Sequence, residues 1–190
     1  MHLRGPMQRC WPCSAPAFEV QAVARIRPLT RILVVGRDPD RTAGFVEKLR
    51  AIGLPAEAAT AEAALRSADI VVTATTSNAP LFQADWVRPG THISSMGSDA
   101  PGKQELPPEL FAKALLFCDL PSQSARIGEF QHAATNLPLT AIGALLTGSA
   151  MGRETADDIT IFDSSGISLQ DLYIGKAILT RSVAGAAAAE

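Results

Sequence analysis

Short apolar runs alternate with amphipathic, helix-like segments along most of this chain. Runs rich in Val, Ile and Leu and bounded by small or polar residues are typical of strands that are buried on both faces of a sheet. Such runs lie at residues 31–36, 69–75, 91–96, 114–119 and 158–163, and a weaker one lies at 55–59. Apolar residues at helical spacing predict helices at residues 18–28, 38–53, 60–68 and 168–183.

Several of these helices carry sequence signals at their ends. Asp38 followed by Pro39 is typical of an N-cap and a first helical residue, and Gly53 is typical of a C-cap. Thr60 and Ser168 can cap the helices that follow them. Strands that alternate with helices predict an α/β fold with a doubly wound, mostly parallel sheet. In such sheets, ligands bind beyond the carboxyl ends of the strands.

The first 17 residues have a different composition. They contain three prolines, Trp11, Cys10 and Cys13 without a period of 2 or 3.6, so we expect no regular structure there. A C-x-x-C pair is typical of a redox centre or of half a zinc site, but no second C-x-x-C follows and no βαβ unit surrounds it. We therefore assign this pair no such function. Cys118 lies in an apolar run and is expected in the core.

The overall composition narrows the class of partner. The 190 residues carry a formal net charge of -2 and are 47% hydrophobic, which gives no electrostatic reason to expect nucleic acid or an anionic membrane surface. No apolar run approaches the roughly 20 residues of a membrane-spanning helix, and the first charged residues lack the apolar segment of a secretory signal. We expect a cytoplasmic protein. The three histidines show no metal-ligand spacing, so we expect no metal.

The segments that follow the strands hold the candidate chemistry. They are small, polar or both, as expected where backbone comes close to a ligand, although ordinary turns share this composition. The leading candidate for proton transfer is Asp99, in the stretch SSMGSDAPGKQEL. An Asp shortly after a glycine is also a common turn former, and the residue types alone favour that second interpretation.

Five stretches give a stronger indication when they are taken together. VVGRDPDR, ADIVVTATTSNAP, RPGTHISSMGSDAPGKQEL, IGEF and DITIFDSSGISLQDL appear in this order from about residue 18 to the end. They resemble successive blocks of the ornithine cyclodeaminase/mu-crystallin family. The resemblance implies a Rossmann-like domain that binds NAD or NADP, a small amino-acid or cyclic-imine substrate, and homodimers. It favours conversion of ornithine to proline and ammonia, with an alanine dehydrogenase or a ketimine reductase as the alternative.

The resemblance also implies roles for individual residues. It makes Asp99 the catalytic acid/base, which favours a cyclodeaminase or an amino-acid dehydrogenase, because some branches that only reduce imines lack an acid there. It puts Arg37 and Asp38 at the cofactor ribose, where an arginine favours the 2′-phosphate of NADP and an acid favours the 2′-hydroxyl of NAD. The other implied cofactor contacts are Thr73, Thr75, Ser94, Ser95, Met96, Lys103 and Ser164. The resemblance puts Asp163, beside Ser164, in the same loop near the nicotinamide.

The chain departs from the family pattern before residue 20, where it has neither the G-x-G-x-x-G phosphate turn nor the amino-terminal substrate domain. We expect an irregular leader at 1–17, a partial NAD(P)-binding Rossmann domain at 18–165, and a helical segment at 166–190 that packs on the missing domain. The first strand of such a sheet is central, and its loss would leave its neighbours unpaired. We therefore expect a truncated, weakly stable or aggregating chain that is inactive alone. The alternative is a non-catalytic remnant or interaction module.

Overall fold

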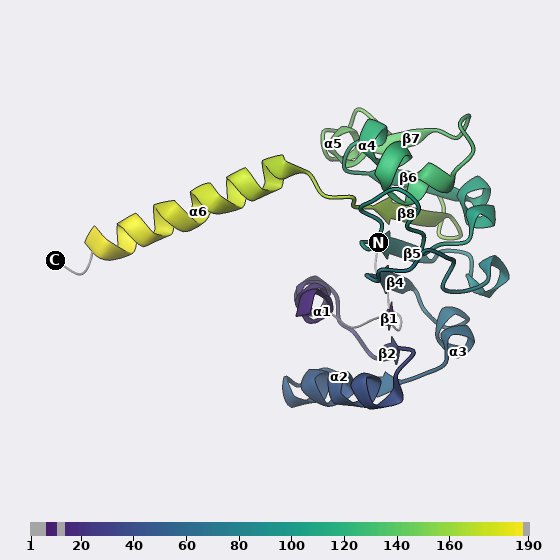
Figure 1. Ribbon diagram of the computed structural model, residues 1–190, viewed down its shortest axis with the longest axis horizontal. Coiled ribbons are helices and arrows are strands. Elements are labelled where there is room, and N and C mark those ends of the chain that lie inside the picture. The colour runs from purple at the N-terminus through teal and green to yellow at the C-terminus, as the bar shows by residue number, and fades with distance from the viewer. Residues whose placement is uncertain (1–6, 11–13, 188–190) are drawn as a thin grey trace.

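One parallel sheet forms the centre of the computed structural model, which describes residues 7–10 and 14–187 (Figure 1). Every adjacent pair of strands runs in the same direction, so the carboxyl ends all meet at one edge. In the described residues the strands are β1 (Met7–Cys10), β2 (Ile32–Val35), β3 (Ala56–Ala58), β4 (Ile70–Thr73), β5 (His92–Ser95), β6 (Ala114–Cys118), β7 (Leu139–Ala141) and β8 (Ile159–Asp163).

Helices connect most of the strands and cover parts of both faces of the sheet (Figure 1). The α-helices are α1 (Ser14–Ile26), α2 (Pro39–Ala51), α3 (Ala61–Leu65), α4 (Pro121–Ile127), α5 (Ile142–Leu146) and α6 (Ser168–Ala187). The 3-10 helices are η1 (Ala84–Trp86), η2 (Pro108–Lys113) and η3 (Glu129–His132). The caps predicted for α2 and α3 are confirmed, because Asp38 and Thr60 each accept hydrogen bonds from the backbone of the first helical turn.

The chain winds to both sides of β1. The strand order is β3-β2-β1-β4-β5-β8-β6-β7, so β2 and β3 extend the sheet in one direction and β4 starts the other half. The last strand, β8, lies between β5 and β6. This confirms the doubly wound, parallel, Rossmann-like sheet. The order reverses between β1 and β4, and at such a switch point the carboxyl ends of the strands form a crevice that suits a ligand.

The prediction that residues 1–17 lack regular structure is wrong for the described part of that segment. Met7–Cys10 forms β1, which pairs with both β2 and β4, and α1 begins at Ser14. The central position that we expected to be missing is therefore filled. A β-ladder is held by backbone N–H and C=O groups and does not require a hydrophobic pattern. None of the four residues of β1 is a proline, so each keeps its N–H for the ladder.

Apolar side chains pack on both faces of the sheet because successive residues of a strand point to opposite sides. On one face, β2 and β4 pack against Val20 of α1 and Val46 and Leu49 of α2. On the other face, Phe111 and Phe130 meet edge to face, with ring centroids 5.6 Å apart, above a cluster that continues through β4, β5, β6 and β8. Cys118 is completely buried in this cluster, which confirms its predicted place in the core.

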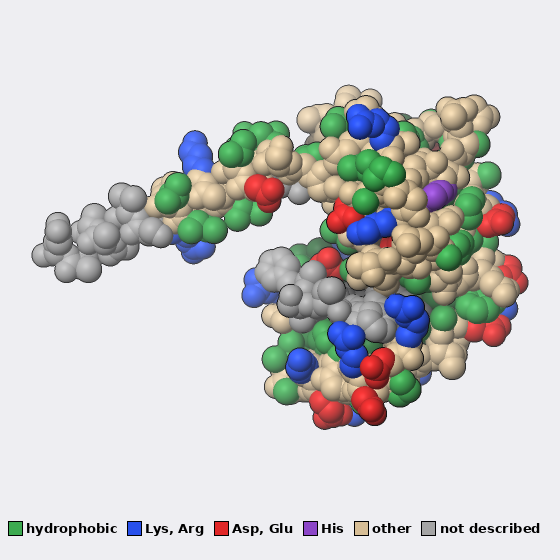
Figure 2. All heavy atoms as spheres, viewed as in Figure 1, with side chains coloured by type: hydrophobic (Ala, Val, Ile, Leu, Met, Phe, Trp, Pro, Cys, Tyr) green, Lys and Arg blue, Asp and Glu red, His purple; other side chains and the backbone are tan. Residues whose placement is uncertain are grey.

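Helix α6 projects away from the sheet after β8 (Figure 1). Its large apolar side chains are 56–69% exposed, and Figure 2 shows hydrophobic side chains along the projecting helix. They are Leu169, Leu172, Tyr173, Ile174, Ile178 and Leu179. Several exposed large apolar side chains on one helix are typical of an interaction site. Within the described ranges, no helix has the length and apolar character needed to cross a membrane.

Candidate active site at the carboxyl edge of the sheet

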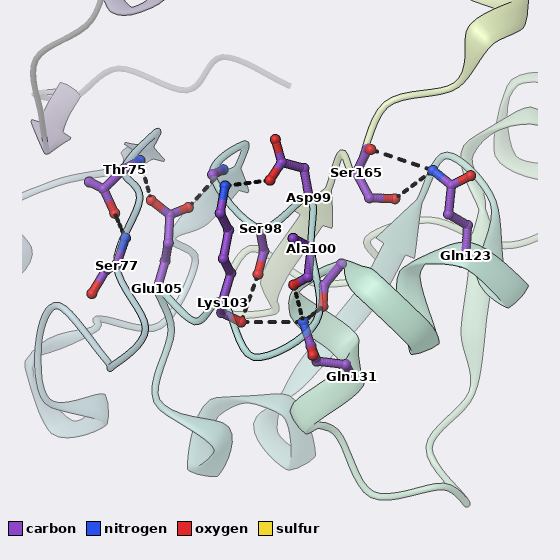
Figure 3. A network of polar contacts seen from close by, with 12 residues as sticks. Thr75, Ser77, Ser98, Asp99, Ala100, Lys103, Glu105, Gln123, Gln131 and Ser165 are labelled. Carbon is purple, nitrogen blue, oxygen red and sulfur yellow. Dashed lines mark hydrogen bonds and ion pairs between the residues drawn. The ribbon is translucent and has the colours of Figure 1, made fainter.

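Asp99 lies at the carboxyl edge of the sheet, on the loop that follows β5. Its side chain is 61% exposed and forms an ion pair with the Nζ of Lys103, whose side chain is 24% exposed. The two residues are four apart in the sequence, and their ion pair spans the turn at residues 101–102, which Figure 3 shows from close by. Asp99 thus presents a carboxylate to solvent at the edge where ligands of this fold class bind.

Side chains from η3 hold the backbone of this loop in place. The carbonyl oxygen of Lys103 accepts hydrogen bonds from Ser98 Oγ at 3.0 Å, Gln131 Nε2 at 3.3 Å and His132 Nε2 at 2.8 Å. Gln131 also accepts from the N–H of Gly102 at 2.8 Å. These bonds fix the loop on both sides of Asp99, because they restrain Ser98 before it and residues 102–103 after it.

A buried glutamate joins this loop to the strands. Glu105 is completely buried, and its carboxylate accepts four hydrogen bonds from the ends of β4 and β5. The donors are Thr73 Oγ1 at 2.7 Å, the N–H of Thr75 at 2.5 Å, Ser95 Oγ at 3.1 Å and the N–H of Gly97 at 2.9 Å. Four donors satisfy both oxygens, which is the condition under which a carboxylate is tolerated inside a fold.

Glu105 belongs to a chain of three buried acids. The carboxylate of Glu129 accepts from the N–H of Glu105 at 3.0 Å and from that of Leu106 at 2.7 Å. The carboxylate of Asp163, at the end of β8, accepts from the N–H of Glu129 at 3.0 Å and from the hydroxyl of Ser124. Each acid thereby holds the backbone of the next, from β8 across to β4 and β5.

Burial raises the pKa values of two of these acids. The pKa of Glu129 rises to about 7, mainly through desolvation, while its backbone hydrogen bonds oppose the rise. The pKa of Asp163 rises to about 6 for the same reason, with Ser124 and the N–H of Glu129 opposing. Near neutral pH, the network therefore holds at least one carboxyl group that is partly protonated.

Two glycines make room for these carboxylates. A Cβ on Gly97 would collide with the carbonyl oxygen of Thr75 and with the carboxylate of Glu105. A Cβ on Gly128 would collide with the carboxylate of Asp163. Neither position has the positive φ that favours glycine, so close approach is the reason for glycine here.

The side chains predicted to contact a cofactor fall into two groups. The hydroxyls of Thr73 and Ser95 donate to Glu105 inside the protein, and both residues are at most 1% exposed. Thr75 and Ser94 are half-buried. Met96 is also half-buried, but it packs against the apolar cluster beneath α1 and α2. The cofactor roles of all five residues stay predictions.

The other predicted residues lie at three strand ends of the same edge. Arg37 is exposed directly after β2, while Asp38 beside it caps α2 through hydrogen bonds to the N–H groups of Asp40 and Arg41. Ser164, after β8, donates from its hydroxyl to Asp119 at 2.7 Å and from its N–H to the carbonyl of Ser95 at 3.0 Å. Lys103 and Asp99 share the loop after β5.

Glu105 and Glu129 organise the site and were not among the residues predicted from the sequence. Both occur in the stretches that resemble the family, but no role was assigned to either. Neither acid lies in one of the predicted apolar runs, so there was no local sign in the sequence that either is buried.

A separate cavity of about 460 Å³ lies across β5, β6 and β8, on the same side of the sheet as α1. His92 and Arg153 both contact the hydroxyl of Thr160 there, at 2.8 and 3.1 Å. Desolvation, with a smaller contribution from Arg153, lowers the pKa of His92 to about 4, so this histidine is neutral at pH 7. These contacts make His92 a packed side chain of the sheet, and the residues that line the cavity do not include Asp99.

The parallel sheet, its strand order and the candidate site at its carboxyl edge make this chain a Rossmann-like α/β protein. Residues 13–186 match the sequence profile of the ornithine cyclodeaminase/mu-crystallin family. The chain belongs to this family, which confirms the resemblance noted from its sequence blocks.

Two curated relatives illustrate the range of activities in the family. The iminosuccinate reductase of Paracoccus denitrificans is 36% identical over 168 residues, which are 86% of this chain and 52% of the relative. The ornithine cyclodeaminase of Agrobacterium fabrum is 34% identical over 157 residues, which are 81% of this chain and 44% of the relative. The chain thus spans about half the length of the curated relatives it matches.

Solved structures show the same fold. An archaeal alanine dehydrogenase dimer with bound NAD superposes with a TM-score of 0.90 at 30% identity, over 96% of this chain and 58% of that one. The iminosuccinate reductase of Paracoccus denitrificans in complex with NAD⁺ superposes with a TM-score of 0.87 at 34% identity, over 93% of this chain and 56% of that one.

Proposed function

We propose that this chain provides the NAD(P)-binding and acid/base part of an enzyme that oxidises and deaminates an amino acid, with ornithine as the substrate and proline and ammonia as the products. One observation carries the proposal. Asp99 is an exposed carboxylate on a restrained loop at the carboxyl edge of a Rossmann-like sheet. The bound NAD in two structural relatives supports a nicotinamide cofactor at the corresponding edge.

The donor groups at this edge fit such a cofactor. Arg37, exposed at the end of β2, would meet the ribose or its 2′-phosphate, and Thr75, Ser94 and Lys103 would hold the nicotinamide half. When bound, the cofactor would supply a hydride acceptor for the α-carbon of the substrate and then, in its reduced form, the hydride that converts the cyclic imine to proline.

Asp99 would move the protons that this chemistry requires. Its Oδ atoms can take a proton from the α-ammonium group of the substrate, so that the nitrogen lone pair becomes available to form the imine. After the δ-amine forms a new bond to the α-carbon, the same carboxyl group can return a proton to the α-nitrogen, which departs as ammonia. Lys103 restrains the carboxylate through their ion pair and keeps it at the edge.

The direct test is a product assay with L-ornithine and either NAD⁺ or NADP⁺, comparing the wild-type chain with Asp99→Asn. Because we propose that the substrate domain lies outside this chain, the assay is run with that domain supplied. The proposal then expects proline and ammonia with the wild-type chain and a rate about 10²–10⁴-fold lower with the variant, with cofactor affinity retained. Asp85→Asn, at an exposed position in η1, is the control and should keep the wild-type rate. Equal rates for wild type and D99N would contradict the assigned role of Asp99.

A second enzymatic function is favoured by relatives of equal or higher identity. One is named alanine dehydrogenase and is 34% identical, and the iminosuccinate reductase is 36% identical. In that case water would attack the imine and release a keto acid, or the reverse reaction would reduce an imine. Formation of a keto acid in place of proline identifies this alternative.

A non-catalytic role is the remaining alternative. A chain that binds neither NADH nor NADPH would support it.

We propose further that residues 166–190 pack on a substrate domain outside this chain and that the assembled protein is a homodimer. The exposed apolar side chains of α6 support this role, because burying such surface is favourable by about 25 cal/mol per Å². The archaeal alanine dehydrogenase, a dimer, supports the second part.

A further inference from the structure

Glu105 lies where the loop that carries Asp99 meets the ends of β4 and β5. We propose that Glu105 is the positioning residue of this edge, and that its carboxylate fixes the Asp99 loop against both strands. The inference rests on the proposed role of Asp99, because it states how that carboxylate is kept in place.

Both oxygens of Glu105 are needed, because each accepts a backbone N–H. Oε1 accepts from Thr75 at 2.5 Å, and Oε2 accepts from Gly97 at 2.9 Å. The hydroxyls of Thr73 and Ser95 can rotate to suit a different partner, but a backbone N–H cannot. A glutamine at this position would place its NH₂ group against one of the two N–H groups in either orientation.

The same carboxylate closes the loop on itself. Gly97 begins the loop and Glu105 ends it, so the hydrogen bond between them joins the two ends. Between these ends, the carbonyl of Lys103 is held by Ser98 and Gln131, and Lys103 is paired with Asp99. The position of Asp99 relative to Thr75 therefore follows from the contacts of one buried side chain, which Figure 3 shows beside the loop.

Two further acids extend this restraint to β8. Glu129 holds the N–H groups of Glu105 and Leu106, and Asp163 holds the N–H of Glu129. Asp163 is completely buried, so it acts on the edge through Glu129 and Glu105 and not by facing a ligand. The loops after β5 and β8 are thus joined through side-chain-to-backbone bonds.

The test compares Glu105→Gln with Glu109→Gln, a control in η2 whose side chain is exposed. Amide hydrogen exchange is measured by NMR at Thr75 and Gly97, with Met96 as an internal reference because its N–H bonds to the carbonyl of Thr73 at 2.8 Å. We expect E105Q to exchange at least tenfold faster at Thr75 and Gly97 while Met96 keeps its rate, and E109Q to match the wild type. Wild-type rates at both amides in E105Q would overturn the proposal.

If E105Q does not fold, the amide exchange rates of the wild-type chain still test the proposal. Thr75 and Gly97 should then exchange as slowly as Met96, whereas exchange at the rate of an unprotected amide would overturn the proposal.

Cofactor titration separates positioning from the function proposed above. We expect NADH or NADPH to bind E105Q at least tenfold more weakly than the wild type or E109Q. Wild-type affinity in E105Q, despite fast exchange at Thr75 and Gly97, would overturn the positioning role. A wild-type chain that binds neither cofactor would instead contradict the proposed function, and the exchange rates would still decide whether Glu105 holds the loop.

Discussion

Glycines show at the residue scale how tightly the candidate site is packed. Gly97→Ala would force its new Cβ against the carboxylate of Glu105 and the carbonyl of Thr75. We expect the free energy of unfolding to fall by about 2–3 kcal/mol, because the colliding atoms belong to backbone and to a fully bonded side chain. Urea unfolding measures this. Gly44→Ala in α2, where the added Cβ meets nothing within 4 Å, is the control and should gain about 0.5–1 kcal/mol. Equal effects at the two glycines would contradict the packing described.

A second residue-scale prediction concerns pH. The folded pKa of Glu129 is raised from 4.5 to about 7, so the folded protein keeps a proton that the unfolded chain loses above 4.5. The contribution of Glu129 to the free energy of unfolding is therefore largest below about pH 4.5. It is lost as the pH rises toward 7, by roughly 3 kcal/mol in total.

Glu129→Gln removes this titration. The glutamine oxygen can still accept from the N–H groups of Glu105 and Leu106, which both bond to Oε1. Urea unfolding at pH 5 and pH 7.5 should therefore show a smaller decline for the variant than for the wild type. Asp163, whose pKa is about 6, leaves a residual decline in both proteins. Parallel curves for the two proteins would count against the raised pKa of Glu129.

Arg37 allows a residue-scale test of cofactor choice. A guanidinium at the end of β2 favours the 2′-phosphate of NADP through a charge-assisted hydrogen bond. Arg37→Gln should weaken NADPH binding about tenfold and leave NADH binding within about twofold of the wild type. Fluorescence titration measures both affinities, with Arg66→Gln, whose side chain pairs with Glu62, as the control. If the variant bound both cofactors more weakly by the same factor, Arg37 would have no part in discriminating between NAD and NADP.

At the scale of single elements, the strongest prediction follows from the central position of strand β1 in the sheet. It pairs with both β2 and β4, so deletion of residues 1–13 would leave two central strands with unpaired backbone groups. We expect this deletion to abolish the single cooperative thermal transition and to promote aggregation. Deletion of residues 1–6 leaves Met7–Cys10 in place and should keep the transition. A cooperative melt at the wild-type temperature in the longer deletion would contradict the central position of β1.

The elements also show what the sequence could and could not predict. Runs such as 31–36 and 158–163 became strands because their β-branched residues are buried on both faces. Strand β1 carries no such pattern, and its place depends on ladder bonds to distant strands. Strand β7 has only three residues, which is too short for a periodic signal. The insertion of β8 between β5 and β6 depends on tertiary contacts.

The same distinction applies to the candidate site. The loop with Asp99 could be found because strand ends and family blocks both mark it. Glu105 could not be assigned, because its four donors come from Thr73 to Gly97 and no local pattern records their approach. Thr73 and Ser95 look like ligand-facing hydroxyls in the sequence, but in the fold they donate to a buried acid.

At the scale of the whole molecule, the exposed apolar surface of α6 predicts self-association of the purified chain. Leu172 and Leu179 are seven residues apart, and therefore on one face of the helix, and are 69% and 67% exposed. Replacing both with glutamine should lower the apparent mass in sedimentation velocity experiments and change the melting temperature little. Lys176→Gln, on the same helix, is the control. An unchanged association in the double variant would show that α6 does not drive it.

The whole account depends on a dinucleotide site at the carboxyl edge of this sheet. Isothermal titration of the wild-type chain with NADH and NADPH tests this most directly. We predict saturable binding of one stoichiometric equivalent of at least one of them, with a Kd between roughly 1 μM and 1 mM, the range common for enzyme ligands. No detectable heat of binding with either nucleotide, from a chain that melts cooperatively, would contradict the account.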